Sequence, residues 1–299
     1  MKQLYRSILV LTLLLVGGCH KPEPAISGYQ LLLVAEPYLP LMQQEVDQFL
    51  SLYPNVRMQV RSSSTRGAIV SLLNDSVSTI VIDRPFNEEE KQVAQQASIR
   101  LVENKIADDG IAIIVHKQNP IPNMTAESVE RIVTGTATEW RQVAESHRTG
   151  PVDFVLTGIN SGIYELLQKK IFNVSKSLEP TTVMTSQRDV IQYVATHPDA
   201  VGFVAASILK QGPVEVKVVP VLTKSANGET KEYFAGQLEL HESLYPFHYS
   251  LYLYNAEAKA AVGVGFSSLV LSQVGQKIFQ ESGLVPVSIP YRTIQLHAE

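Results

Sequence analysis

Residues 31–82 read LLLVAEPYLPLMQQEVDQFLSLYPNVRMQVRSSSTRGAIVSLLNDSVSTIVI. A short apolar run at 31–35 has the length of a strand buried on both faces, and two further strands are expected at 56–60 and 79–82. Apolar residues at helical spacing follow the first run at Met42, Val46, Phe49, Leu50 and Tyr53. A shorter helix is expected over residues 67–73. This alternation of strand and helix predicts right-handed crossovers and a mostly parallel sheet.

A second region of the same kind begins near Gly110. Strands are expected at 111–115, 152–156 and 201–204, and helices after Thr125, over 161–172 and over 186–196. The chain then shows strand-like segments at 214–219 and 249–254, and a long helical pattern from about 258 to 280. These patterns predict an α/β protein of two lobes, each a mixed sheet flanked by helices. Lobe 1 is assigned residues 29–109 and 206–299, and lobe 2, inserted into it, residues 110–205.

The N-terminus indicates export. It reads MKQLYRSILVLTLLLVGGC, with a basic start and an apolar run too short to span a membrane comfortably, which predicts a signal peptide over residues 1–18. The segment Val16-Gly17-Gly18-Cys19 resembles the bacterial lipobox, so Cys19 is expected to carry a lipid. The alternative is an uncleaved anchor in which the cysteine is incidental. With lipidation, residues 19–28 form a tether, and the body is anchored to a bacterial membrane at its periplasmic face or at the cell surface.

The composition excludes several functional classes. The formal net charge of −4 disfavours a generally basic nucleic-acid-binding surface. A single cysteine excludes an internal disulfide and a cysteine-rich metal cluster. The seven histidines are scattered, without a metal-binding pair, and glycine patterns that bind nucleotide phosphates are absent. We therefore expect no metal, no cofactor and no nucleic-acid partner.

Polar loops follow three of the expected strands. In doubly wound sheets, ligands bind where the carboxyl end of a strand leads into a helix, and hydroxyls with free backbone N–H groups at a helix start favour an anion. The loops are 62–67, 82–86 and 157–162, and their candidate ligand-binding residues are Ser64, Thr65, Arg66, Asp83, Asn160, Ser161 and Gly162. Taken singly, each loop is equally typical of a solvated turn or a helix cap.

An enzymatic function is disfavoured. Ser161 lies in Gly-Ile-Asn-Ser-Gly rather than in the G-x-S-x-G turn of α/β-hydrolases. A hydrolase using Ser161 remains the alternative, but a base and an orienting carboxylate are not readable near this serine.

Four motifs, in the expected order, resemble the phosphate-binding-protein-like branch of the periplasmic solute-binding proteins of ABC transporters. They are NPIPNMTAESVERIVTGTATEW at 119–140, HPDAVGFV at 197–204, YP with LYLY between 245 and 254, and SQVGQKIFQESGLVP at 272–286. The resemblance covers nearly the whole mature chain. It implies the type II fold of this family, with two α/β lobes closing on a ligand in the cleft between them.

The resemblance also implies roles for particular residues. Residues 64–69 occupy the position of the family's serine-glycine loop, and Asp83 that of its turn aspartate. Ser161 and Gly162 match the serine and glycine of its last loop. The ligand implied is phosphate or a related small oxyanion, handed to an ABC permease, and we expect the protein to be a monomer.

The departures from the family pattern concern charge. The family arginine, the natural bidentate partner of phosphate, falls on Thr157, and the hydroxyl near the first strand falls on Glu36-Pro37. The family's acidic or serine position falls on Ile159 and its closing threonine on Ile163. Replacement cations are Arg66, Arg84 or Arg188, of which the first two are expected at the cleft. The alternative is therefore that the chain is a divergent family member that has lost phosphate binding. It would act as a sensory or assembly lipoprotein, or bind another small solute.

Overall fold

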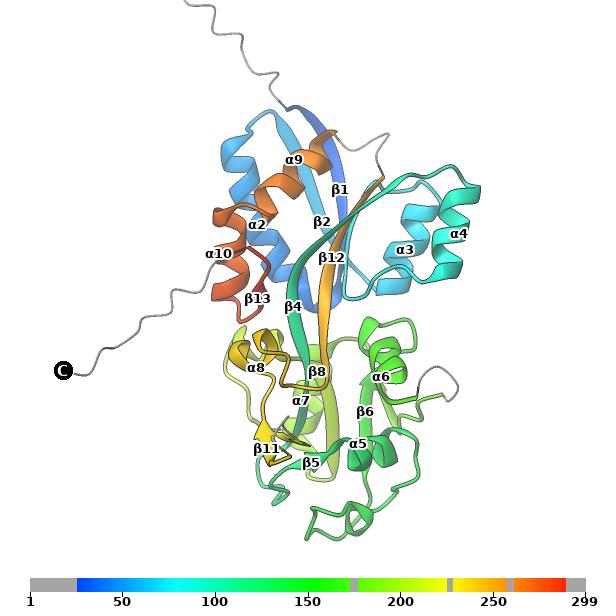
Figure 1. The fold of residues 1–299 in the computed structure, drawn as a ribbon, viewed down its shortest axis with the longest axis vertical. Coiled ribbons are helices and arrows are strands. Elements are labelled where there is room, and N and C mark those ends of the chain that lie inside the picture. Colours follow the sequence, from blue (N-terminus) through cyan, green and yellow to red (C-terminus); the bar gives the residue numbers. More distant parts are fainter. Residues whose placement is uncertain (1–25, 173–176, 225–227, 257–260, 289–299) are drawn as a thin grey trace, which may run out of the picture.

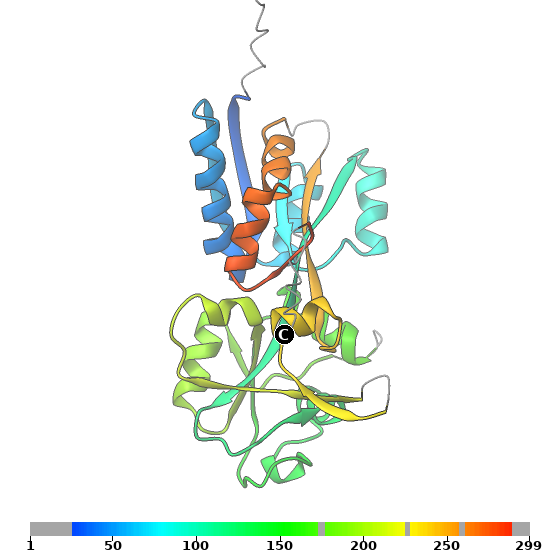
Figure 2. The ribbon, with the colours of Figure 1, turned by 60° about the vertical axis from the view of Figure 1, so that its left-hand side comes forward.

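The computed structural model describes residues 26–172, 177–224, 228–256 and 261–288. The signal peptide, Cys19 and most of the predicted tether lie outside these residues. Two lobes are stacked along the long axis of the molecule (Figures 1 and 2). Strand β4 (Leu101–His116) runs from one lobe into the other, and β12 (His248–Ala256) pairs with its first half up to the junction. The two-lobed α/β architecture expected from the sequence is confirmed.

Lobe 1 is built around a sheet with the order β2-β1-β3-β12-β4. The first three of these strands are parallel, and β12 runs antiparallel to both of its neighbours. Besides β4 and β12, the elements are β1 (Gly28–Ala35), η1 (Glu36–Tyr38), α2 (Leu39–Leu52), β2 (Val56–Ser63), α3 (Thr65–Leu73), β3 (Thr79–Ile82), α4 (Glu88–Gln96), α9 (Ala261–Val270), α10 (Gln273–Glu281) and β13 (Val285–Pro286).

The apolar run of β1 explains the three layers of this lobe. Leu32 and Val34 are fully buried in the core that also contains residues of α2, α9 and α10. Leu31 and Leu33 point the other way and pack into the smaller core that contains residues of α3. Because side chains alternate along a strand, four successive apolar residues require helices on both faces, as Figure 1 shows.

Lobe 2 contains a sheet with the order β4-β8-β6-β7 and a small sheet with the order β11-β10-β5. Its helices α6 and α7 start at the ends of β6 and β7 that face lobe 1 (Figure 1). The elements are β5 (Met124–Thr125), α5 (Ala126–Val133), η2 (Trp140–Gln142), β6 (Asp153–Thr157), α6 (Gly162–Phe172), β7 (Thr182–Met184), α7 (Gln187–Thr196), β8 (Ala200–Ala205), η3 (Ala206–Lys210), β9 (Val216–Val219), β10 (Val221–Lys224), β11 (Thr230–Tyr233) and α8 (Gln237–His241).

The return to lobe 1 comes later than the sequence-based boundary at residue 206. Strand β9 pairs with the half of β4 that lies in lobe 2, from Ile113 to His116, and β10 pairs with β5. We therefore place residues 206–247 with lobe 2 and the return at β12. The sequence pattern did not predict this boundary, because the residues of a short strand do not specify with which sheet the strand pairs.

Two elements differ from their predicted extent. The helix expected over 258–280 is divided into α9 and α10, because Ser272 caps the second helix and the backbone turns there. Gly275 permits the turn, since a Cβ at this position would lie 2.5 Å from the carbonyl oxygen of Leu269. The strand expected at 111–115 is the second half of the 16-residue β4. Its first half mixes polar and apolar residues, and side-chain bonds such as Ser250 Oγ to Asp108 Oδ1 (2.5 Å) accompany its pairing with β12.

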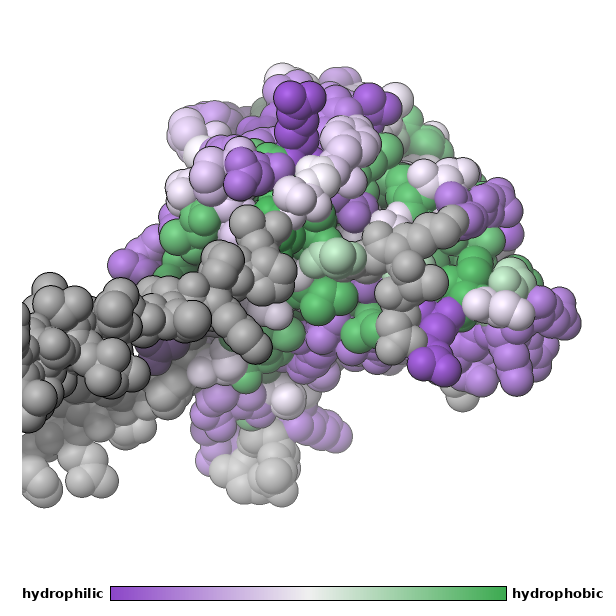
Figure 3. All heavy atoms as spheres, turned by 90° about the horizontal axis from the view of Figure 1, so that it is seen from above, coloured by the Kyte–Doolittle hydropathy of each residue, from purple (hydrophilic) through white to green (hydrophobic). Residues whose placement is uncertain are grey.

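Viewed along its long axis, the end of lobe 1 carries apolar side chains interspersed with polar ones (Figure 3). Among the described residues, none of the helices combines the length and apolarity that crossing a bilayer demands.

Candidate functional site

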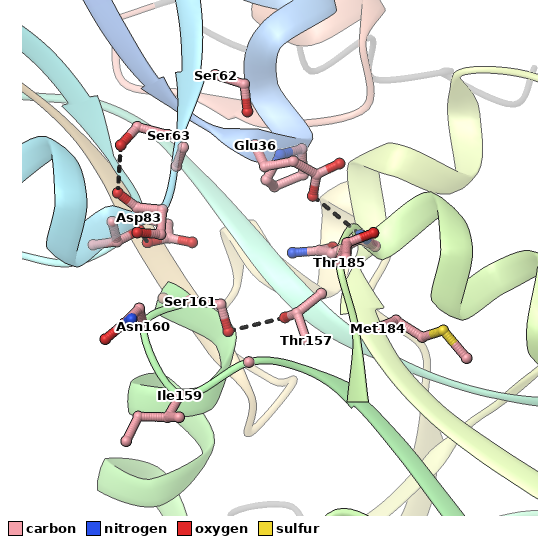
Figure 4. Close-up of a pocket in the computed structure, with 17 residues that line it drawn as sticks. Glu36, Ser62, Ser63, Asp83, Thr157, Ile159, Asn160, Ser161, Met184 and Thr185 are labelled. Atoms are coloured by element: carbon pink, nitrogen blue, oxygen red, sulfur yellow. Dashed lines mark hydrogen bonds between the residues drawn. The ribbon is translucent and has the colours of Figure 1, made fainter. Parts of the chain in front are cut away.

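A cavity of about 440 Å³ lies between the lobes, where the carboxyl ends of strands from both lobes meet (Figure 4). Lobe 1 contributes residues at or just after the ends of β1, β2 and β3, and lobe 2 contributes residues at or just after the ends of β6 and β7. Its walls consist of Ala35, Glu36, Pro37, Ser62, Ser63, Ser64, Thr65 and Asp83 from lobe 1, and of Thr157, Gly158, Ile159, Asn160, Ser161, Gly162, Met184, Thr185 and Gln187 from lobe 2. The three predicted loops therefore do meet at one hollow.

The wall from lobe 1 is organised by the start of α3. Ser64 is the N-cap, and its Oγ accepts a hydrogen bond from Gly67 N at 3.1 Å. The next residue, Thr65, donates its hydroxyl to Asp83 Oδ1 at 2.5 Å, which joins the ends of β2 and β3. Asp83 is 2% exposed, and its burial raises the pKa of this carboxyl while the Thr65 bond opposes the rise.

The wall from lobe 2 is organised by the start of α6. Thr157 donates its hydroxyl to Ser161 Oγ at 2.9 Å, and Ser161 Oγ also accepts from Tyr164 N at 3.3 Å. The first N–H groups of a helix have no backbone partner within it; in α6 the N–H of Tyr164 is satisfied by Ser161 Oγ, and those of Gly162 and Ile163 precede it at this end. A Cβ added to Gly162 would lie 1.7 Å from Asp83 Oδ1, which shows how closely the carboxyl of lobe 1 sits against α6.

The sequence analysis missed the contribution of β7 and α7. Met184, the last residue of β7, and Thr185 after it line the cavity, and Gln187 begins α7. The N–H of Gln187 donates to Glu36 Oε2 of lobe 1 at 3.1 Å. Burial raises the pKa of Glu36, opposed by this bond. The same strand-end rule would have found these residues had the three-residue β7 been recognised.

Arg66 and Arg84 do not line this cavity. Both line a second cavity of about 600 Å³ next to it, which shares Ile159 with the first. Arg66 contributes a backbone contact across the lobes, from its N–H to Asn160 O at 3.3 Å. Arg84 forms a two-pronged ion pair with Glu90, at 2.8 Å for both bonds, and a further ion pair with Glu165 of lobe 2.

The remaining candidate, Arg188, donates to Gln211 Oε1 at 3.3 Å and does not line the cavity either. Consequently, the described residues that form the cavity walls include two carboxylates, Glu36 and Asp83, and no lysine, arginine or histidine. Three helices, α3, α6 and α7, direct their N-termini to this region. Positive potential in the cavity therefore comes from helix ends and backbone N–H groups.

The strands at the junction enclose a buried polar network. Asp109, on β4, accepts hydrogen bonds from Tyr38 Oη (3.0 Å), Ser207 Oγ (2.6 Å) and the N–H of Gly110 (2.7 Å). Tyr38 also meets the hydroxyl of Tyr249 on β12 at 2.5 Å. Burial raises the pKa of Asp109 to about 6, although its hydrogen bonds lower it. This network joins η1 of lobe 1 to η3 of lobe 2.

The site does not resemble a hydrolytic centre. Ser161 pairs with Thr157, and the described walls contain no histidine to act as its base. In the part of the chain that the structure describes, His, Cys, Asp and Glu do not form a group of three or more able to hold a metal ion.

Comparisons with known proteins agree with the geometry. The family model described as the PBP superfamily domain matches residues 21–274. Protein SphX of Synechococcus elongatus is 24% identical over 293 residues, covering 95% of this chain and 86% of SphX. The phosphate-binding protein PstS of Staphylococcus saprophyticus is 23% identical over 250 residues, covering 82% of this chain and 76% of PstS.

Solved structures share the fold. A Clostridium perfringens substrate-binding protein crystallised with bound phosphate superimposes with a TM-score of 0.73 at 21% identity, covering 87% of this chain and 100% of that chain. An ABC-type phosphate transport receptor from Vibrio cholerae gives a TM-score of 0.67 at 18% identity, with coverages of 87% and 100%. The resemblance drawn from the four sequence motifs is confirmed.

Proposed function

We propose that this chain, which belongs to the PBP superfamily, is a solute-binding protein that captures phosphate or a related small oxyanion between its lobes. The cavity carries the proposal, because it is formed by residues of both lobes and receives three helix N-termini. An oxyanion held there would contact both lobes at once, and a ligand that bridges two lobes stabilises the closed arrangement by its differential affinity for it. The names of the relatives support the class of ligand.

Within this proposal, Ser161 and the N–H groups around Gly162 donate hydrogen bonds to the oxyanion, while Thr65, whose hydroxyl proton goes to Asp83, lines the site. Ser64 positions α3 as its cap. The backbone carbonyl oxygen of Asn160 accepts the hydrogen bond from Arg66 N that joins the lobes. Arg66 is assigned this backbone contact rather than a side-chain contact with the ligand.

The test is calorimetric titration of the mature soluble body with phosphate, sulfate and molybdate, combined with small-angle scattering. We expect heat of binding for at least one oxyanion and a smaller or unchanged radius of gyration when it is bound. The absence of heat with every anion, together with an unchanged melting temperature, would contradict the proposal, because a ligand that binds the native state must stabilise it.

We base a proposal for the cellular context on the N-terminal motif and the family. The proposed protein is exported, lipidated on Cys19, monomeric and not an enzyme, and it delivers its ligand to an ABC permease. Mass spectrometry of the membrane fraction checks the lipid: a mature N-terminal Cys19 bearing acyl chains is expected, and Cys19→Ser should release the protein from membranes.

The second candidate is a family member with a changed ligand or a sensory or assembly role. It is favoured by the absence of a cationic side chain from the described cavity walls, where the family arginine is replaced by Thr157. Binding of an organic anion in preference to phosphate, sulfate and molybdate would support a changed ligand. Absence of all anion binding would favour the sensory or assembly role.

A further inference from the structure

The two carboxylates of the cavity differ in how the protein satisfies them. Asp83 is almost completely buried, accepts the Thr65 hydroxyl at 2.5 Å and lies against the start of α6. The groups that favour its negative charge belong to lobe 1: the Thr65 hydroxyl, its own backbone N–H and Arg84.

Only one of the two carboxylate oxygens of Glu36 has a hydrogen-bond donor among the described residues. Glu36 is half-buried, and its Oε2 accepts the N–H of Gln187 at 3.1 Å. For its second oxygen, Oε1, the described residues supply no hydrogen-bond donor. Of the charged groups near it, Asp189 disfavours its negative charge and Arg188, paired with Gln211, favours it. A carboxylate oxygen is thus left with acceptor capacity at the cavity wall.

The positions of these groups separate two ends of the cavity. Figure 4 shows Asp83 on one side, and Glu36 with Thr185 on the other. The N-termini of α3 and α6 adjoin the Asp83 side through Thr65 and Gly162. An oxyanion placed there lies away from Glu36 and so avoids repulsion from that carboxylate, but it lies beside Asp83, to which a protonated oxyanion would donate its hydrogen.

The cavity has room for a ligand larger than orthophosphate. Its volume of about 440 Å³ falls within the range of sites for organic molecules, about 300–1,000 Å³, whereas orthophosphate has only five non-hydrogen atoms. Met184 and Ile159 add apolar wall to the polar ends. The space therefore suits an oxyanion that carries a short organic chain.

We propose that the ligand is an amine-bearing organic oxyanion, whose oxyanion group binds at the N-termini of α3 and α6 and whose ammonium group pairs with Glu36. This inference rests on the proposed function, because it assumes that the cavity is the oxyanion site. It assigns Glu36 as the specificity-determining residue. A cation on the ligand supplies the positive charge that the described wall side chains lack.

Calorimetric titration with three probes tests the assignment: orthophosphate, ethylphosphonate and 2-aminoethylphosphonate. The last two share size and oxyanion group and differ in the ammonium. For the wild-type protein, we expect 2-aminoethylphosphonate to bind at least about tenfold more tightly than ethylphosphonate, because the pair forms in a partly desolvated cavity.

The variant Glu36→Gln keeps the shape of the side chain and an acceptor oxygen, and removes its charge. We expect the ratio of the two phosphonate affinities to fall to near one, while ethylphosphonate binds as well as before or better. Glu127→Gln, at an exposed position on α5 away from the cavity, is the matched control and should keep the wild-type ratio.

The outcomes separate the two proposals. If phosphate or ethylphosphonate binds and the amine gives no advantage, or if Glu36→Gln leaves the ratio unchanged, the assignment of Glu36 is overturned while the oxyanion function stands. If none of the three probes binds, both fail.

Discussion

Glu45, on the buried face of α2, shows how a single residue can set a pH dependence. Its side chain is fully buried, and neither carboxylate oxygen has a hydrogen-bond partner. Burial raises the pKa of this group from 4.5 to about 8. At neutral pH the residue is therefore protonated in the folded protein and ionised in the unfolded chain.

The sign of the effect follows from the protons bound. Between pH 4.5 and about 8, the folded state holds a proton that the unfolded state has lost, so the free energy of unfolding falls as pH rises, by about 1.4 kcal/mol per pH unit. We predict that Glu45→Gln gains stability relative to wild type at this rate across the window. Urea unfolding at several pH values measures it, with Asp47→Asn on the exposed face of the same helix as control. A parallel pH dependence of Glu45→Gln and wild type would contradict the prediction.

Thr65 is a second residue whose role depends on one bond. Thr65→Val leaves the buried Asp83 without its side-chain donor, at a cost of about 1–3 kcal/mol in the free energy of unfolding. We also expect weaker binding of phosphate, since the hydroxyl lines the cavity. Ser62→Ala removes another hydroxyl from the same wall and should leave stability unchanged. Thermal unfolding and calorimetry measure both effects, and equal stabilities for the two variants would refute this role.

At the scale of elements, the start of α6 decides how closely the lobes approach. Only a glycine at position 162 leaves room for Asp83, because a Cβ there would lie 1.7 Å from its Oδ1. The sequence predicted Gly162 as part of a binding loop, whereas the structure shows that it leaves space for the Asp83 carboxyl of the other lobe. This role depends on the contact between the end of β3 and the start of α6, which the sequence does not show.

We therefore predict that Gly162→Ala prevents full closure and weakens phosphate binding by at least about tenfold. Gly158→Ala, in the same loop, is the matched control, since its Cβ would meet nothing nearer than 3.9 Å. Small-angle scattering should show a larger radius of gyration for Gly162→Ala alone. A Gly162→Ala protein that closes and binds like wild type would show that the close approach is not required.

At the scale of the whole molecule, polar contacts join the lobes around the cavity. They include the ion pair of Arg84 with Glu165, the bond of Glu36 with Gln187, and a bond from Gln211 Nε2 to Pro37 O at 2.9 Å. Under the proposed function, in which the lobes close on a ligand, each of these contacts favours the closed arrangement.

The ion pair of Arg84 with Glu165 is the easiest of these contacts to remove cleanly. The pair is mostly shielded, with side chains 9% and 25% exposed. We predict that Glu165→Gln enlarges the ligand-free molecule in solution and weakens phosphate binding by about threefold to tenfold. Lys91→Ala breaks an exposed pair within lobe 1 and is the control. Unchanged scattering and affinity in Glu165→Gln would mean that this pair does not favour closure.

The sequence by itself determined most of the local elements and the position of the candidate site. Apolar runs such as 31–35 require burial on both faces, and hydroxyl-rich loops after strands require helix starts, because these are demands of short-range sterics and hydrogen bonding. The alternation of such segments was enough to predict two α/β lobes and to bring Thr65, Asp83 and Ser161 to one cavity.

Only the tertiary structure decided which charges face that cavity and where each strand pairs. Arg66 and Arg84 lie in loops beside the site, but a side chain leaves its loop in a direction fixed by packing, and Arg84 is taken by Glu90 and Glu165. Glu36 meets Gln187 across 151 positions of the sequence. Such contacts depend on how the two lobes are placed relative to each other. Local sequence patterns do not predict contacts between residues so far apart in the chain.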